Sequence, residues 1–417
     1  MEMKAGINLH RATFAALAAM VACGESDAPP GPRAVETDSA GIGIVTSPPV
    51  DAVYARLAAQ PALTVGEADG PEEYLFGRIA SVARDGEANL VVADGRAGEV
   101  RIFDPRGRHL RTVGGTGEGP GEFGWLGGAW PVPEGGIVAV DGSRQRIARF
   151  GADGSLTGTA DLAGVGEMGI FATRGMAGAG MVLSQVTELG VPTDAETSAR
   201  DLEETLEEGS SVLFIRHGLD GGVVDTLARR PGQKSTMSTS GSGDMAMVQV
   251  VFVPFSPLPS AAGSPRAVAV TGGGLYEVAL FDAAGEPSRI LRLDEIPVPR
   301  TDEHLEALVR SPGRRVPDEE SVRAMMDMYR DMPMPERLPA YSGLVFADTG
   351  ELWARRYLVP GGETAHWDVF GANGHHLGRV EVPASLRIQE VSRGQVVGIA
   401  TGELGVERVE VLDLIFG

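Results

Sequence analysis

The sequence predicts an all-β chain that folds as a six-bladed β-propeller with a small helical insertion between blades four and five. The first observation is a five-residue cassette, in which an apolar strand ends, three residues follow, and a Gly precedes the next strand. A Gly at that place supplies the positive φ that a tight β-hairpin turn requires. The second observation is the spacing, because the first two copies lie 47 residues apart (103 to 150), the length of a four-stranded blade. The five copies are Phe103–Gly107, Phe150–Gly154, His217–Gly221, Phe281–Gly285 and Phe370–Gly374.

Blade one shows the most regular pattern, with strands expected at 79–83, 90–94, 100–104 and 109–113. In blades one and two an Asp (Asp94, Asp141) ends the second strand, nine residues before the Phe of the cassette, and we expect both carboxylates to cap the local turn. Blade one resembles the NHL repeat in the order of its motifs. A strand ends in Val-Ala-Asp, the next strand ends in Phe-Asp-x-x-Gly, and Gly-x-Gly-x-Gly-Pro-Gly-Glu-Phe follows. The motifs match over residues 64–150 and the pattern continues to 417. The resemblance implies an NHL-like six-bladed propeller of the bacterial envelope.

The later blades follow the same frame. Blade six lacks a fourth strand, and the strand-like segment 41–46 has no blade of its own. We therefore expect 41–46 to pair with 406–414, which would remove an open sheet edge. The expected strands are 169–173, 181–186, 212–217 and 223–228 in blade three; 247–253, 267–271, 276–282 and 289–293 in blade four; 341–346, 352–357, 366–370 and 377–382 in blade five; and 386–391, 395–401 and 406–414 in blade six.

Two helices are expected within the insertion 296–338. Thr301 is an N-cap signal, and Asp318 precedes a Met-rich amphipathic run to residue 331. The acidic segment 193–210 is either a short helix or a solvated loop. In a propeller, two classes of loop lie on the same face: those between the second and third strands of a blade, and those between blades. We call it the long-loop face. We expect binding there, because the long insertions all fall in these two classes. They are 187–211, 229–246, 296–338 and 358–365.

Residues 1–23 have the features of an export signal. Lys4 and Arg11 precede an apolar stretch that is too short to span a bilayer as a permanent helix. The stretch ends in Met-Val-Ala-Cys-Gly, which resembles the lipobox of bacterial lipoproteins, and Cys23 is the only cysteine. The resemblance implies that Cys23 is lipidated, that residues 24–40 tether the propeller 41–417, and that the protein is in the outer membrane, facing the periplasm or the exterior. The alternative is an ordinary secretory signal that ends beside a cysteine.

Composition and motifs limit the chemistry. The net charge of −21 argues against nucleic-acid binding, which needs a basic face. Gly119–Gly124 matches Gly-x-Gly-x-x-Gly, but no helix is expected after it to bind a pyrophosphate. The expected innermost strands contain no His, and no nucleophile motif occurs, so we expect binding without catalysis and no cofactor. The NHL resemblance implies the alternative, a metal-dependent hydrolase or lyase with Ca or Zn in the central channel.

Aromatic and arginine residues near the long-loop face are the candidate binding residues. Such sets suit the recognition of anions or peptides. The partner class stays open between an envelope protein, a peptide and a glycan, and the membrane is contacted through the lipid anchor alone. His375 and His376 could hold a metal, but a solvated pair in a turn is the favoured interpretation. The candidate binding residues are Trp125, Arg144, Trp353, Arg355, Arg356 and Tyr357.

Overall fold

A computed structural model describes residues 33–164, 169–178, 180–188, 209–240, 247–311, 318–402 and 404–417. All statements below concern the compact unit Ala34–Gly417. The expectations for Cys23, for the signal segment 1–23 and for the acidic residues 193–208 lie outside the described residues. Part of the expected tether forms β1 (Val35–Ser39), which pairs with β2 (Ile42–Ser47).

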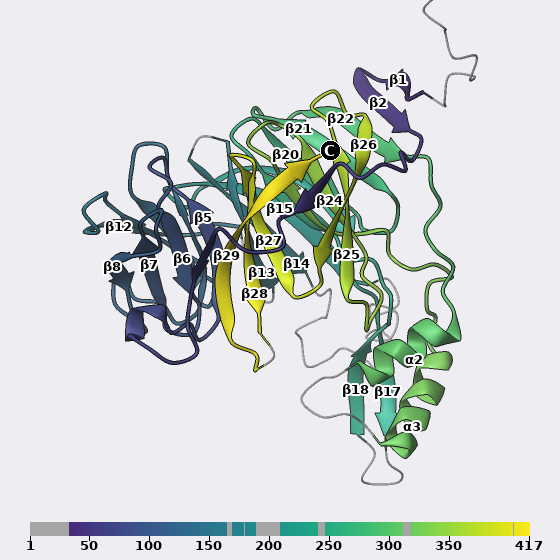
Figure 1. Cartoon of the computed structure of the whole chain (residues 1–417). Coiled ribbons are helices and arrows are strands. Elements are labelled where there is room, and N and C mark those ends of the chain that lie inside the picture. Colours follow the sequence, from purple (N-terminus) through teal and green to yellow (C-terminus); the bar gives the residue numbers. More distant parts are fainter. Residues whose placement is uncertain are drawn as a thin grey trace, which may run out of the picture. The chain divides into compact units, whose positions relative to one another are not determined.

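The chain forms the expected six-bladed β-propeller, and within each blade neighbouring strands are antiparallel (Figure 1). Blade one is β5 (Ile79–Arg84), β6 (Leu90–Asp94), β7 (Glu99–Phe103) and β8 (His109–Gly114). Blade two is β9 (Leu126–Pro131), β10 (Ile137–Asp141), β11 (Arg146–Phe150) and β12 (Leu156–Asp161). Blade three is β13 (Gly169–Ala177), β14 (Met181–Glu188), β15 (Ser211–Gly218) and β16 (Val223–Pro231).

Blade four is β19 (Ser260–Gly263), β20 (Ala267–Thr271), β21 (Glu277–Asp282) and β22 (Pro287–Leu293). Blade five is β23 (Tyr341–Phe346), β24 (Leu352–Arg356), β25 (Thr364–Phe370) and β26 (His376–Pro383). Blade six is β27 (Leu386–Ser392), β28 (Gln395–Thr401) and β29 (Glu407–Phe416), completed by an earlier segment of the chain. The first strands of the six blades contact one another in a closed circle, β5–β9–β13–β19–β23–β27–β5, so these six strands enclose the centre of the propeller.

The closing strand is not the expected one. β2 pairs in parallel with β22 and extends the outer edge of blade four. The edge of blade six is covered by β3 (Ala55–Leu57) and β4 (Leu63–Val65), both antiparallel to β29. The prediction that 41–46 pairs with 406–414 is therefore wrong, although an N-terminal segment does close the last blade. The physical reason is packing, because Leu63 and Val65 of β4 contribute to the core that blades six and one share.

The first strand of blade four also differs from the prediction. Residues 247–253 were expected there, but β18 (Met247–Phe252) pairs with β17 (Ser235–Ser240) in a separate two-stranded ribbon. β19 lies at the centre in their place. A Cβ atom at Gly263 would lie 2.1 Å from the carbonyl oxygen of Met176 in blade three. The central position therefore requires a strand of small residues, whereas β-propensity favoured the bulkier segment.

The five cassettes form the hairpin turns between third and fourth strands. Their glycines have φ values between 79° and 91°, and each hairpin contains a β-bulge at the residue that begins the cassette. Each turn also contacts the preceding blade. A Cβ at Gly374, for example, would lie 2.7 Å from Leu291 of blade four. The cassette glycine thus satisfies the turn geometry and permits close packing between blades.

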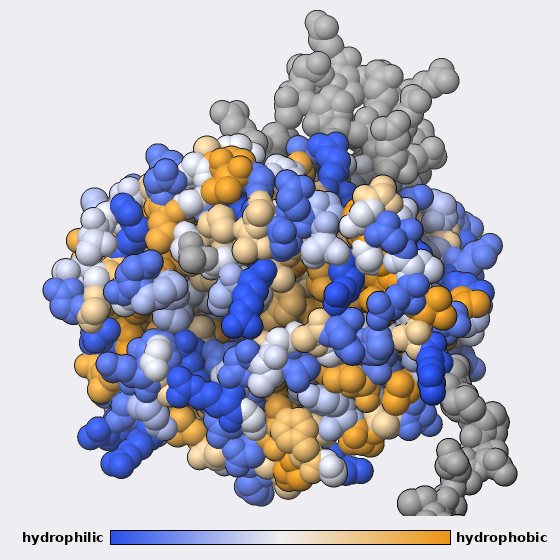
Figure 2. Space-filling model, turned by 90° about the horizontal axis from the view of Figure 1, so that it is seen from above, coloured by the Kyte–Doolittle hydropathy of each residue, from blue (hydrophilic) through white to orange (hydrophobic). Residues whose placement is uncertain are grey.

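The helical insertion lies between blades four and five, as expected. α2 (Asp302–Arg310) and α3 (Glu319–Arg330) begin after the caps Thr301 and Asp318. The helices pack with Phe255, Tyr357 and Val359, so they cover loops of blades four and five. The only other helix among the described residues is the single 3₁₀ turn η1 (Glu72–Tyr74), and none of these helices is long and apolar enough to cross a membrane. Figure 2 shows the face opposite the insertion, where polar residues prevail and apolar residues are scattered among them.

Candidate ligand-binding cavity

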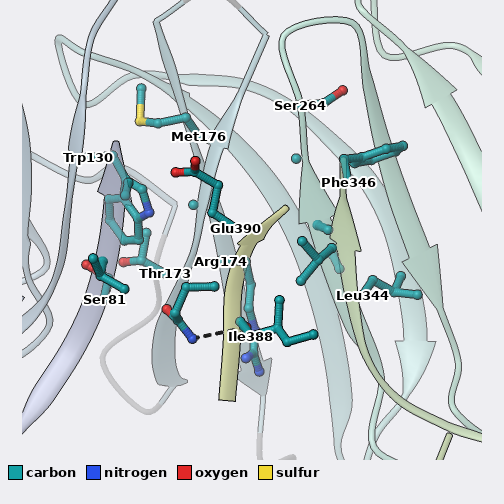
Figure 3. A pocket seen from close by; sticks show the side chains of 18 of the residues that line it. Ser81, Trp130, Thr173, Arg174, Met176, Ser264, Leu344, Phe346, Ile388 and Glu390 are labelled. Carbon is teal, nitrogen blue, oxygen red and sulfur yellow. Dashed lines mark hydrogen bonds between the residues drawn. The ribbon is translucent and has the colours of Figure 1, made fainter. Parts of the chain in front are cut away.

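The first strands of the six blades enclose a cavity of about 660 Å³ (Figure 3). This volume lies within the range of small-molecule sites, which runs from roughly 300 to 1,000 Å³. Five of the strands place Gly or Ala against this space, and such residues are too small to fill it. They are Ala80, Gly127, Gly175, Ala262 and Gly343.

Much of the cavity wall is apolar. Trp130 of blade two and Met176 of blade three contribute to it, and blades five and six add Leu344, Phe346 and Ile388. In Figure 3, Trp130 lies on one side of the cavity while Leu344 and Phe346 lie on the other. The apolar part of a ligand would therefore lose contact with water here, which favours binding.

Glu390 is the only carboxylate among the described residues that line the cavity. Its Oε2 accepts a hydrogen bond from the backbone N–H of Arg84 at 2.8 Å, and its Oε1 lies 3.9 Å from Nη1 of the same residue. The Arg84 guanidinium also donates to Ser392 and Gln395, at 3.2 and 2.7 Å. Arg84 and Glu390 therefore neutralise each other within the wall.

Three more arginines line the cavity, and they differ in their partners. Arg387 donates to Glu407 at 2.7 Å. Arg174 donates its Nε–H to the amide oxygen of Gln185 at 2.7 Å. Arg355 lies beside Gly343, where an added Cβ atom would be 3.6 Å from the Cβ of Arg355. Arg174 is exposed, whereas Arg355 is half-buried and desolvation lowers its pKa. Within the described chain neither forms an ion pair, so these two cations are available to an anion.

Two polar atoms of the wall lack hydrogen-bond partners in the described part of the chain. One is the indole Nε1 of Trp367, a residue that is 3% exposed, and the other is Oγ1 of Thr173. An indole N–H can only donate, and a buried donor without a partner costs about 1–3 kcal/mol. Both atoms are buried within the wall, so a ligand in the cavity does not reach them.

The lining residues do not fit the Ca or Zn ion that the NHL resemblance offered as an alternative. Calcium needs several oxygen ligands and zinc needs His, Cys or carboxylate ligands. The cavity offers Glu390 alone, and it is already paired with Arg84. In the described ranges no three His, Cys, Asp or Glu side chains come together as a metal site would require.

A buried Ser–His pair occurs in blade three but has no access to the cavity. Ser184 Oγ lies 2.9 Å from Nδ1 of His217, and Nε2 of His217 lies 2.9 Å from the carbonyl oxygen of Ala163. Both side chains are fully buried, and burial lowers the pKa of His217. His217 occupies the position that is Phe in the other four cassettes, so we assign it a structural role.

The six candidate binding residues do not form one site. Trp125, which is 40% exposed, and Arg144 both lie beside Asp141 on the long-loop face. The Arg144 guanidinium is 3.1 Å from Glu118 and 3.2 Å from Asp141. Among the six residues, Arg355 alone lines the cavity.

The other three candidates have packing or pairing roles. Trp353 is buried in the core between blades five and six, and Tyr357 packs on Phe255 beneath the helices. Arg356 donates to Asp368 at 2.8 Å and to Glu295 at 2.6 Å. The structure therefore leaves the Arg356 guanidinium with protein partners on both sides.

The expectation for the His pair needs a correction. His375 is partly exposed and lies 3.1 Å from Glu36, but the His376 side chain is buried and lies 3.2 Å from Asp368. Its Nδ1 accepts a hydrogen bond from the backbone N–H of Val50 at 3.0 Å. His376 is thus part of a buried polar network, since residues 47–50 cover a turn that the sequence indicates to be solvated.

Asp94 and Asp141 have the structural role that their common position predicted. Each carboxylate is buried and accepts backbone N–H bonds both from its own turn and from the chain that enters the blade. For Asp141, burial alone would raise the pKa, but hydrogen bonds from Ser143, Gly124 and Arg144 outweigh it, so the pKa is lowered.

A second hollow, of about 690 Å³, lies on the long-loop face between blade four and the segment after α3. We call it the loop groove. Its walls combine apolar residues with charges of both signs. The lining residues include Pro231, Lys234, Pro257, Leu275, Glu277, Met334, Pro335 and Glu336.

The sequence contained one signal for the cavity that its motifs did not bring out. Two runs of small residues, Gly127–Ala129 and Ser260–Gly263, occur shortly before the second strand of a blade, where a first strand is expected. Bulky residues normally fill the centre of a small β-structure. Small residues there indicate either close packing of neighbouring strands, as at Gly263, or open space, as at Gly127, and the sequence does not distinguish the two. Arg174 and Trp130 have no comparable signal.

Comparison with known proteins identifies the fold alone. Neither the family models nor the curated protein sequences give a match. A DUF4221 family member from Bacteroides vulgatus is similar at 11% identity, over 87% of this chain and 99% of that chain, with a TM-score of 0.51. A candidate exported protein from Bacteroides fragilis (9% identity, 90% and 99%, TM-score 0.46) and an inactive virginiamycin B lyase from Staphylococcus aureus with quinupristin (11%, 92% and 99%, TM-score 0.40) are more distant.

Proposed function

We propose that this chain is an exported lipoprotein, anchored in the bacterial outer membrane through Cys23, whose propeller binds a ligand and performs no catalysis. The observation that supports binding is the cavity, where six first strands meet in a circle and leave about 660 Å³ unfilled. Its polar lining is rich in arginine, and the described residues around it include neither His nor a set of metal ligands. These residues can bind and orient a ligand, and their one carboxylate, Glu390, is already paired with Arg84.

We propose a separate role for the long-loop face, which is contact with an envelope protein, a peptide or a glycan. The loop groove supports this role, as do Trp125 and Arg144 at another point of the same face. Long loops on a rigid scaffold commonly carry such contacts.

A cavity-filling substitution tests the ligand site. Gly343→Leu should reduce binding of the neutral fluorescent probe N-phenyl-1-naphthylamine at least about tenfold, because a Leu side chain would occupy the cavity. Gly343 has no positive φ, and an added Cβ meets only ordinary contacts. Gly43→Leu is the matched control, because nothing lies within 4 Å of that position on β2. Equal probe binding by both variants and the native protein would contradict the cavity as the site.

Mass spectrometry tests the anchor. Protein extracted from its native envelope should begin at a lipid-modified Cys23, and Cys23→Ser should shift the protein out of the membrane fraction. An unmodified N-terminus at another residue would contradict lipidation. Metal analysis of the same preparation should find no stoichiometric Ca or Zn, and a tightly bound ion would favour the hydrolase or lyase alternative.

A further inference from the structure

We infer that the central cavity selects small organic anions, with Arg174 and Arg355 binding the charged group and the apolar wall binding the remainder. The inference rests on the proposed binding function of the cavity and names the chemical class of its ligand.

The first step is the charge of the wall. Four arginines and one glutamate line the cavity. Arg84 pairs with Glu390, and Arg387 pairs with Glu407. Arg174 and Arg355 therefore leave two positive charges that no described carboxylate offsets. Arg174 is exposed and Arg355 is half-buried, so both guanidinium groups can be reached by an anion in the cavity, which each would attract through charge-assisted hydrogen bonds.

The second step is the placement of the two guanidinium groups. Arg174 lies on β13 of blade three, where Gln185 of the neighbouring strand orients its Nε–H. Arg355 lies on β24 of blade five and reaches the same cavity past Gly343. The two groups approach from different blades, and each presents a planar fork of donors, a geometry that suits a carboxylate or a phosphate ester.

The third step is the remainder of the wall. Trp130, Leu344, Phe346 and Ile388 would contact an apolar part of the ligand. A small inorganic ion would leave most of the 660 Å³ empty. An organic anion uses both the charged and the apolar walls.

Two probes with one skeleton test the inference. 1-Anilinonaphthalene-8-sulfonate carries a sulfonate, whereas N-phenyl-1-naphthylamine is its neutral analogue. Arg174→Gln and Arg355→Gln should each raise the Kd of the sulfonate about tenfold, the loss expected for one charge-assisted hydrogen bond, and change the Kd of the neutral probe less than about twofold. Arg106→Gln is the matched control. It changes the net charge by the same amount, and Arg106 is an exposed residue of a hairpin turn.

Competition distinguishes the two anion types. Both 1-naphthoate and 1-naphthyl phosphate should displace the sulfonate probe at concentrations at least about tenfold lower than neutral 1-naphthamide, which can use only the apolar wall. The inference is wrong if the arginine variants bind the sulfonate as tightly as Arg106→Gln does, or if 1-naphthamide competes equally well. If the neutral probe instead binds Gly343→Leu and the native protein with the same Kd, the proposed cavity function itself is wrong. Unchanged thermal unfolding of each variant excludes misfolding as the cause.

Discussion

Arg355 and Arg356 are neighbours on β24, yet they belong to two regions of different kind. Successive side chains of a strand point to opposite faces. Arg356 shares the face of Leu352 and Ala354 toward blade four, whereas Arg355 shares the face of Trp353 toward blade six and the cavity. Arg356 belongs to an ionic network, whereas Arg355 lines the cavity without an ionic partner in the described chain.

The network joins blades four and five around Asp368, which is 0% exposed. Asp368 accepts hydrogen bonds from Tyr341, Arg356 and Arg379 and contacts His376. Burial alone would raise the pKa of Asp368, but the hydrogen bond from His376 and the charge of Arg356 lower it. The two arginines thus differ in their partners, because carboxylates compensate the charge of Arg356, whereas no carboxylate of the described chain pairs with Arg355.

Removing the central carboxylate should have the largest effect. Asp368→Asn removes the carboxylate that Arg356 and Arg379 share. Because the site is buried, the free energy of unfolding should fall by about 3–5 kcal/mol. Urea unfolding followed by circular dichroism measures it. Asp51→Asn, at an exposed position, should change stability by less than about 0.5 kcal/mol. A loss below about 1 kcal/mol for Asp368→Asn would show that the network does not hold the blades together.

The two neighbouring arginines should respond differently to the same change. Arg356→Gln should cost about 3 kcal/mol, because it leaves the buried Asp368 and the half-buried Glu295 without their main cation. Arg355→Gln should stay within about 1 kcal/mol of the native protein, since it removes a charge without an ionic partner. Urea unfolding midpoints of the two variants, measured with unchanged m-values, compare their losses of stability. Equal losses in the two variants would refute the distinction between the regions.

The smallest effect is a dependence on pH. The folded-state pKa values of Asp368 and Glu295 are lowered, so their contribution is present above their unfolded pKa values of about 4 and is lost as pH falls through the lower folded values. The stability gap between native protein and Asp368→Asn should therefore shrink below about pH 4, by at most about 1.4 kcal/mol per pH unit. Thermal unfolding between pH 7 and 3 checks it, and a constant gap would mean that Asp368 does not titrate as the network requires.

Local chemistry made several features predictable from the sequence. Gly107 and Gly154 are recognised because a hairpin turn needs positive φ within a few residues of its strands. Thr301 and Asp318 are recognised as caps for a similar reason, because they accept the N–H groups of the turn that follows them. The shared position of Asp94 and Asp141 in two blades predicted their common structural role. Candidate binding residues were harder, since only Arg355 of six lines the cavity.

The blade cassettes, the helix starts and the order of the blades could be predicted from the sequence, because each depends on residues that are close along the chain. Tertiary structure decided which N-terminal strand covers β29, since 42–47 and 63–65 have similar local patterns and only packing against blades six and four distinguishes them. It also decided the roles of Arg355 and Arg356. A bulge between Tyr341 and Gly343 sets the register of β24, and that register directs one guanidinium to the cavity and its neighbour to the network.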